Sequence, residues 1–194
     1  MGIDHDRDIR PHLIAALTPR ASWLCEEFSA DGKVDVATVE DRRLCGYEIK
    51  AARDTLKRLT LAGGAQVEMF SRTFDRVTLV CAAKHVRPAL AIVPAWWGIT
   101  VASVDGFAVH REAADNPNDP TPRMAWMLWS DEALSLLRSH GMHRGARTRG
   151  AMSQRIATLP REAIRAAVFD ALRAREWGPV RKRKPMVRCA EVWP

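Results

Sequence analysis

Lys33-Val-Asp-Val-Ala-Thr-Val39 is rich in β-branched residues, and this composition predicts a β-strand. A second strand is predicted over Leu44-Cys-Gly-Tyr-Glu-Ile-Lys50. The residues between them, Glu40-Asp-Arg-Arg43, form a polar turn of hairpin length. An antiparallel hairpin is therefore the expected centre of a sheet.

Helices and further strands are predicted on both sides of this hairpin. Before it, apolar residues recur at helical spacing over 8–18, and Trp23–Phe28 fits either a strand or the end of a helix. After it, the pattern predicts helices over 51–61, 65–72 and 85–92, and strands over 76–82 and 99–103. This order predicts an α/β fold with a mixed sheet.

The C-terminal part of the chain is expected to be helical. Residues 112–123 contain three prolines and several Asn and Asp residues, which resist regular structure, so they are expected to form a linker. The linker would separate an α/β core over 1–111 from a helical module over 124–178, followed by a basic tail over 179–194. Within the module, helices are predicted over 130–139, over 149–158 and from Pro160 onward.

Positive charge is concentrated in the C-terminal quarter. Residues 140–194 contain 13 Lys and Arg and 4 Asp and Glu, a net charge of +9, whereas residues 1–139 contain 17 and 19, a net charge of −2. The two parts sum to the +7 of the whole chain of 194 residues. A basic quarter on a nearly neutral body suggests a nucleic-acid partner, although a solvated basic surface is the plain alternative.

Several classes of protein are not expected. No apolar stretch approaches the roughly 20 residues of a membrane helix, and the first ten residues lack the apolar run of a secretory signal. The cysteines at 25, 45, 81 and 189 have no zinc-site spacing, and no Gly-rich loop is present to bind ATP phosphates. We therefore expect a cytoplasmic protein without membrane contact.

Three charged residues of the hairpin could carry chemistry. Glu48 and Lys50 are two positions apart on one strand and share a face, and the neighbouring strand can bring Asp35 beside Glu48. Two carboxylates of this kind suit Mg²⁺ or Mn²⁺, and a lysine alongside can stabilise a phosphate under attack. The same spacing also occurs by chance, and alternating Glu and Lys are common on a solvent-exposed strand. The acidic pair Glu26-Glu27 precedes Asp35.

These residues belong to a set of motifs that resembles the PD-(D/E)XK nuclease superfamily, and more closely a family of uncharacterised bacterial and phage proteins named after a locus tag. The resemblance covers roughly residues 8–104. Its pieces are Asp8-Ile-Arg10, Glu27-Phe28, Val34-Asp-Val-Ala37, Gly46-Tyr-Glu-Ile-Lys50, Asp54-Thr-Leu-Lys-Arg-Leu59, Phe74-Asp-Arg-Val-Thr-Leu-Val80, His85 and Pro94-Ala-Trp-Trp-Gly98.

The resemblance implies a restriction-endonuclease-like αβββαβ core, here with a small C-terminal helical region added. It implies Asp35, Glu48 and the carbonyl of Ile49 as ligands of Mg²⁺ or Mn²⁺, with Lys50 as the catalytic amine. It also favours Glu27 over Glu26 as a further acid at the metal. Many relatives carry Gln-x-x-x-Tyr on the following helix; here Gln66 fits as a nucleic-acid contact, but position 70 is Phe.

We therefore expect a metal-dependent nuclease that hydrolyses phosphodiester bonds, with DNA favoured over RNA, by metal-activated water. Two alternatives are a non-catalytic nucleic-acid-binding protein on a nuclease scaffold and a basic adaptor that binds a protein; a homodimer is left open. Besides Gln66, the residues expected to contact nucleic acid are basic residues of the C-terminal quarter: Arg147, Arg149, Arg161, Arg165, Arg181, Lys182, Arg183 and Lys184.

Overall fold

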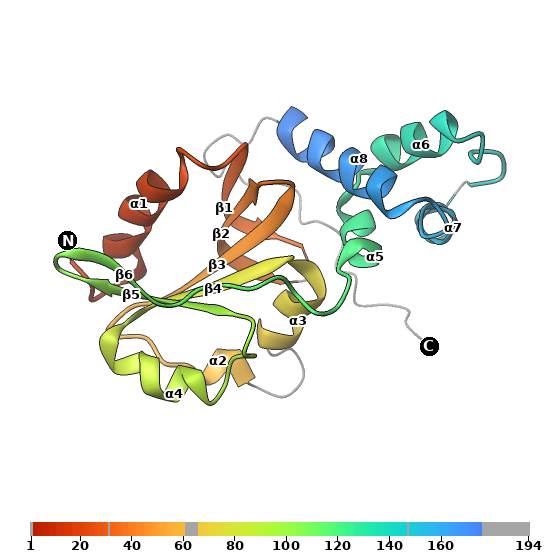
Figure 1. The fold of residues 1–194 in the computed structure, drawn as a ribbon. Coiled ribbons are helices and arrows are strands. Elements are labelled where there is room, and N and C mark those ends of the chain that lie inside the picture. Colours follow the sequence, from red (N-terminus) through yellow and green to blue (C-terminus); the bar gives the residue numbers. More distant parts are fainter. Residues whose placement is uncertain (1, 31, 61–65, 147, 176–194) are drawn as a thin grey trace.

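The computed structural model describes residues 2–30, 32–60, 66–146 and 148–175. They form a mixed α/β fold with a six-stranded sheet and a helical C-terminal region (Figure 1). The strands are β1 (Trp23–Ser29), β2 (Lys33–Glu40), β3 (Arg43–Lys50), β4 (Arg76–Ala82), β5 (Gly98–Ser103) and β6 (Gly106–Arg111). The helices are α1 (Asp6–Leu17), α2 (Lys57–Thr60), α3 (Gln66–Thr73), α4 (Val86–Leu90), α5 (Thr121–Met124), α6 (Ser130–Ser139), α7 (Arg149–Ile156) and α8 (Arg161–Ala174), with short 3₁₀ turns at Ala83–His85 and Ala125–Met127.

The sheet follows the chain order from β1 to β6. β1, β2 and β3 are antiparallel neighbours, β4 and β5 continue parallel to β3, and β6 returns antiparallel to β5. The expected mixed sheet and the element order of an αβββαβ core are therefore present. The helices α2 and α3 supply the crossover that two parallel neighbours such as β3 and β4 require.

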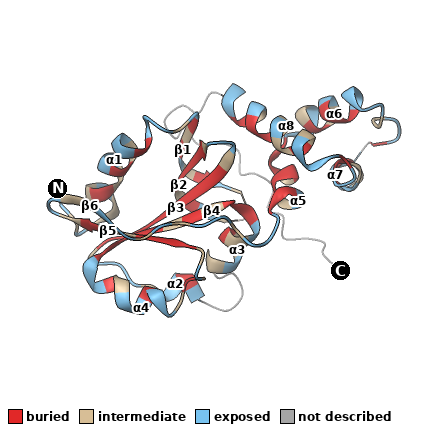
Figure 2. Ribbon diagram, viewed as in Figure 1, coloured by how far each residue is buried: buried red, intermediate tan, exposed pale blue. Residues whose placement is uncertain are grey.

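Each face of the sheet is covered by a different apolar layer (Figure 2). Ile9, Leu13 and Leu17 of α1 pack with Tyr47 and Ile49 of β3 on one face. On the other face, α3 and the C-terminal helices pack against β3 and β4 in a single continuous cluster. Members of that cluster include Leu44, Phe70, Phe74, Leu79, Trp97, Met124, Leu137, Ile164, Val168 and Leu172. The C-terminal helices therefore share one apolar core with the sheet.

Residues 112–120 form neither helix nor strand, yet they bond directly to the sheet. Asp115 receives Nε–H hydrogen bonds from Arg43 at 2.8 Å and from Arg76 at 2.6 Å. The Asn116 side-chain amide donates to the carbonyls of Ser71 and Phe74 at 2.6 and 2.9 Å. These contacts hold the segment expected to be a linker against the starts of β3 and β4.

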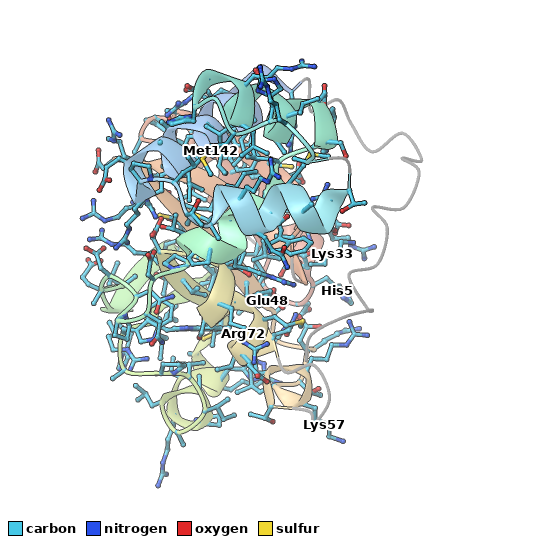
Figure 3. All side chains as sticks on the ribbon, turned by 90° about the vertical axis from the view of Figure 1, so that its right-hand side faces the viewer. His5, Lys33, Glu48, Lys57, Arg72 and Met142 are labelled. Atoms are coloured by element: carbon cyan, nitrogen blue, oxygen red, sulfur yellow. The ribbon has the colours of Figure 1, made fainter. Side chains whose placement is uncertain are left out.

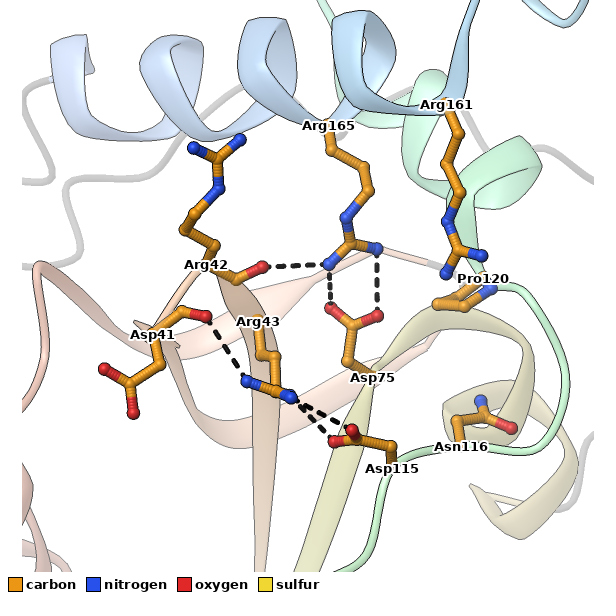
Figure 4. Close-up of a pocket in the computed structure, with 9 residues that line it drawn as sticks. All are labelled: Asp41, Arg42, Arg43, Asp75, Asp115, Asn116, Pro120, Arg161 and Arg165. Atoms are coloured by element: carbon orange, nitrogen blue, oxygen red, sulfur yellow. Dashed lines mark hydrogen bonds and ion pairs between the residues drawn. The ribbon is translucent and has the colours of Figure 1, made fainter.

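An ion pair joins α8 to the beginning of β4 (Figure 4). Arg165 donates to the two carboxylate oxygens of Asp75 at 2.9 and 2.7 Å, and to the carbonyl of Arg42 at 2.9 Å. Asp75 also accepts the backbone N–H of Leu44 at 2.7 Å. The pair lies beside a cavity of about 310 Å³ whose lining residues are Asp41, Arg42, Arg43, Asp75, Asp115, Asn116, Pro120, Arg161 and Arg165.

The structure differs from the sequence prediction in several places. The last residues of the expected linker form the start of the short helix α5 (Thr121–Met124). Residues 51–56 do not continue into a helix: the Asp54 carboxylate accepts the backbone N–H of Ala51 at 2.8 Å, and Ala52 donates to the carbonyl of Ile3 at 2.8 Å. The backbone groups that a helix would use are thus taken by a side chain and by the N-terminal segment. β6 was not predicted; its exposed Val109 gives no amphipathic signal.

The hairpin turn adopts a backbone conformation that its sequence does not predict. Asp41 and Arg42 have φ of 45° and 61°, the left-handed region that two-residue hairpin turns require and that Asn-Gly usually supplies.

Within the described residues, no helix has the length and apolar character needed to span a bilayer.

Candidate functional site

Glu48 and Lys50 lie on the same face of β3 and are both buried, with exposed fractions of 3% and 7%. The Lys50 ammonium donates a hydrogen bond to Oε1 of Glu48. Nε2 of Gln66, at the start of α3, donates to the same oxygen at 2.7 Å. In Figure 3, Glu48 lies in the middle of the view, with Lys33 and His5 to its right. The structure thus brings together three residues that the sequence analysis selected.

Two oxygens in this cluster are buried without a hydrogen bond from any described residue, namely Oε2 of Glu48 and Oε1 of Gln66. A buried polar atom without a partner costs free energy unless another group, such as water or an ion, satisfies it. Burial is also the main reason that the pKa of Glu48 is raised to about 7, and the nearby Asp35 carboxylate adds to the effect. The positive charge near Glu48 therefore does not fully offset the cost of burying its carboxylate.

Asp35 reaches the site because the ladder between β2 and β3 ends beside it. The paired residues stop at Val36 and Tyr47, and Oδ2 of Asp35 accepts the backbone N–H of Ile49 at 2.7 Å. Oδ1 accepts a hydrogen bond from Nη2 of Arg10 at 3.0 Å. Burial raises the pKa of Asp35 despite the hydrogen bond from Ile49. The Asp35 carboxylate on β2 also contributes to the raised pKa of Glu48 on the neighbouring strand β3.

Glu27 enters the site through an irregularity in the strands. Its φ is 53°, an uncommon value for a residue other than glycine. Cys25 and Phe28 contact the same apolar layer although they are three residues apart, so the alternation of faces breaks at Glu27. On β2 the alternation breaks next to Asp35, because Val34 and Val36 contact opposite layers.

This break gives Glu27 and its neighbour Glu26 different surroundings. Glu27 pairs with Lys33 and accepts a hydrogen bond from Nη1 of Arg10 at 3.1 Å, and its pKa is lowered mainly by the Lys33 bond. Glu26 is exposed. The structure therefore places Glu27, rather than Glu26, beside the arginine that contacts Asp35.

Arg10 of α1 is a site residue that the sequence analysis did not select, although it stands in the Asp8-Ile-Arg10 motif. It contacts three carboxylates, those of Asp6, Glu27 and Asp35, and its side chain is 11% exposed. The helical spacing of 8–18 predicts only that α1 packs on the sheet. The contact lies where the alternation of faces breaks in β1 and β2, and no local sequence pattern predicts that break.

His85 belongs to the same set of motifs and is the N-cap residue of α4. It is buried, and its Nε2 lies 3.1 Å from the carbonyl oxygen of Ala51, the residue after Lys50. His85 therefore helps to hold the end of β3.

The acidic groups suit a hard cation only in combination with other ligands. Among the described residues, no three side chains of His, Cys, Asp or Glu are grouped so that they could hold a metal ion. Asp35 and Glu48 supply two carboxylates, one with a buried oxygen that no described residue bonds. Mg²⁺ is commonly bound by one or two carboxylates together with waters and substrate phosphates. This donor set fits Mg²⁺ or Mn²⁺ in that open form.

We predict that Glu48 makes the stability of the metal-free protein fall as the pH rises. The folded pKa of about 7 lies above the ordinary 4.5, so between these values the folded state holds a proton that the unfolded state has released. Because one pKa unit corresponds to about 1.4 kcal/mol, we expect a loss of about 2–3 kcal/mol between pH 4.5 and 7. Chemical denaturation in EDTA at several pH values should show this slope in wild type and a flatter one in Glu48→Gln; parallel curves would contradict the prediction.

The basic residues predicted to contact nucleic acid fall into three groups. Arg149 is exposed, with its guanidinium 5.9 Å from the centre of the Trp126 ring, and Arg161 is half-exposed and paired with Asp119 at 3.1 Å. The prediction for Arg165 is wrong in its placement, because that side chain is only 14% exposed and is used by the ion pair with Asp75. The others lie outside the described residues: Arg147, Arg181, Lys182, Arg183 and Lys184.

The chain was compared with known proteins by sequence and by structure. Residues 11–179 match the family described as bacteriophage P4 protein cII. No curated protein matches the chain. A similar solved structure is the SPO1766 protein of unknown function from Silicibacter pomeroyi, which is 18% identical with a TM-score of 0.47; the match covers 71% of this chain and 91% of that one.

Proposed function

The chain belongs to the family of bacteriophage P4 protein cII, and we propose that it is a metal-dependent nuclease with a PD-(D/E)XK type of site. The observation that carries the proposal is the pair of buried residues Glu48 and Lys50 on β3 beside the half-buried Asp35 of β2, with one oxygen of Glu48 left without a partner among the described residues. A carboxylate buried in this way is costly to fold, and perturbed groups of this kind concentrate at functional sites.

The residues have distinct roles in this proposal. Asp35, Glu48 and the carbonyl of Ile49 would hold Mg²⁺ or Mn²⁺, which when bound neutralises phosphate charge and makes water a better nucleophile. The hydrogen bond from the Ile49 N–H fixes the Asp35 carboxylate. Lys50 is held beside Glu48, where its ammonium can orient water or stabilise charge on the phosphate.

Gln66 links this site to α3. Its amide nitrogen is used by Glu48, which leaves its oxygen as an acceptor that no described residue satisfies. A carbonyl-type oxygen accepts hydrogen bonds but does not donate them, so it suits a water or a base amino group rather than a phosphate. Phe70, which takes the position of the tyrosine of many relatives, is buried between Phe74 and Trp97.

Nucleic acid is the proposed substrate class, with DNA favoured. The site itself is rich in carboxylates, so binding of a polyanion needs positive charge elsewhere. The C-terminal quarter has that charge, a net +9 over residues 140–194. In the described part of that region, Arg149 and Arg161 remain accessible for phosphate contacts, whereas Arg165 does not.

Mn²⁺ calorimetry and cleavage assays test the proposal directly. We expect one Mn²⁺ to bind wild type, Asp35→Asn to abolish that binding, and Glu27→Ala to weaken it more than the exposed control Glu26→Gln. Plasmid, linear, branched and single-stranded DNA and RNA should be offered with Mg²⁺, and EDTA should stop cleavage. Cleavage that survives EDTA, or Mn²⁺ binding that survives Asp35→Asn, would refute the proposed site.

DNA binding and cleavage, measured at several salt concentrations, separate the proposed nuclease from the two alternative classes of protein. A non-catalytic nucleic-acid-binding protein would bind DNA with a steep salt slope, about 0.9 in log–log units per phosphate contact, without cleaving it. A protein-binding adaptor would show neither binding nor cleavage. Either result would assign the function to the basic surface rather than to Lys50.

A further inference from the structure

We propose that Arg10 is the internal counter-ion of the metal site. Its guanidinium pairs with the carboxylates of the site in the metal-free protein, and a bound cation displaces it. The inference rests on the proposed function, because it assumes that Asp35 receives a metal ion. It adds α1 to a site otherwise built from β1, β2, β3 and α3.

Hydrogen bonds and ion pairs already occupy the carboxylate oxygens of Asp35 and Glu27. Oδ1 of Asp35 accepts from Arg10 at 3.0 Å and Oδ2 accepts from the Ile49 N–H at 2.7 Å. Oε1 of Glu27 accepts from Arg10 at 3.1 Å, and its other oxygen pairs with Lys33. A cation that coordinates Oδ1 of Asp35 at the distance of about 2.0–2.1 Å that Mg²⁺ requires would compete with the guanidinium for the lone pairs of that oxygen and would repel its positive charge.

The charges of the site also favour exchange. Three carboxylates, those of Glu27, Asp35 and Glu48, are paired with three cations, Arg10, Lys33 and Lys50, so the net charge is zero. A divalent ion added to this group would change the charge to +2. Withdrawal of Arg10 toward Asp6 would lower it to +1. Exchange of Arg10 for the metal is therefore electrostatically better than simple addition.

Arg10 is also anchored by Asp6 of its own helix. Its Nε donates to Oδ1 of Asp6 at 3.1 Å, and its Nη2 pairs with the other oxygen. Asp6 lies one turn earlier on the same helix and is partly exposed. Arg10 thus keeps one carboxylate partner outside the candidate metal site, and it can leave Asp35 and Glu27 without losing all of its ion pairs.

Calorimetric titration with Mn²⁺ tests the exchange. Arg10→Met keeps the apolar stem of the side chain and removes the charge, so we expect Mn²⁺ to bind it about tenfold or more tightly than wild type. Lys33→Met is the matched control, since Lys33 pairs with Glu27 at the exposed side, and its effect should be smaller. In EDTA the Arg10→Met protein should be less stable than wild type, and saturating Mn²⁺ should raise its melting temperature by more.

The outcomes separate this inference from the proposed function. If wild type binds no Mn²⁺, the metal site itself is absent. If wild type binds Mn²⁺ through Asp35 but folded Arg10→Met binds it equally or more weakly, Arg10 is not a displaced counter-ion. Should Arg10→Met fail to fold, the Nη–H groups of wild-type Arg10, which bond Glu27 and Asp35, can be followed by NMR during Mg²⁺ titration. Their exchange with water should speed up as the ion binds, and an unchanged rate would overturn the inference.

Discussion

Replacing Lys50 with alanine is expected to lower Mg²⁺-dependent DNA cleavage by about 10²–10³-fold, the usual loss when one preorganised charge-stabilising donor is removed. Lys50 is buried and pairs with Glu48, so its ammonium is held in one place beside that carboxylate. The variant should still bind Mn²⁺, because the carboxylates of Asp35 and Glu48 remain. The rate constant should be measured at saturating enzyme, so that weaker DNA binding does not contribute.

Lys84→Ala is the matched control for Lys50→Ala, since Lys84 is exposed in the turn that follows β4. It should cleave at the wild-type rate. A Lys50→Ala protein that cleaves within a few-fold of wild type, while remaining folded by circular dichroism, would show that Lys50 only neutralises Glu48. The chemistry would then have to be assigned to other groups.

The second large effect concerns the ion pair between α8 and β4. Arg165→Met should lower the free energy of unfolding by about 3–5 kcal/mol, because it leaves the buried carboxylate of Asp75 without its charged partner. The carbonyl of Arg42 loses its hydrogen bond in the same change. Urea denaturation followed by circular dichroism measures this difference.

Arg161→Met provides the control one turn away on α8. Arg161 pairs with Asp119 at the surface, and exposed pairs of this kind contribute about 0–1 kcal/mol. If both variants lose the same small amount, the Asp75–Arg165 pair is not a structural clamp. Cleavage should be compared only between variants that remain folded.

Most of the sheet could be predicted because its strands are locally apolar and β-branched. β4 is predicted over its observed span, and Gly46, which packs against the Phe74 ring, lies within a strand that its neighbours define. Pairs at i and i+2 on one strand, such as Glu48 and Lys50, follow from geometry alone. Asp35 follows from the antiparallel hairpin, which fixes the strand beside it.

The rest of the site depends on contacts between distant residues. Arg10 reaches Asp35 from α1 at the point where the alternation of faces breaks in β1 and β2, and this break accompanies the left-handed conformation of Glu27. Arg165 shows the opposite error. Its place in a basic helix suggested a surface contact, but Asp75, 90 residues earlier in the chain, captures it. Charge patterns do not reveal such partners.

The coordinated break in alternation at Glu27 and Asp35 makes the site sensitive to chain length as well as to side-chain chemistry. Deleting one residue between Cys25 and Phe28 would leave them two positions apart, so that a regular strand could keep both in the same apolar layer without the left-handed conformation of Glu27. The residues on one side of the deletion would then be shifted by one position against β2, and the carboxylate beside Arg10 would lose its place. Single-residue insertions and deletions in β1 and β2 should therefore be far more damaging than conservative substitutions at the same positions.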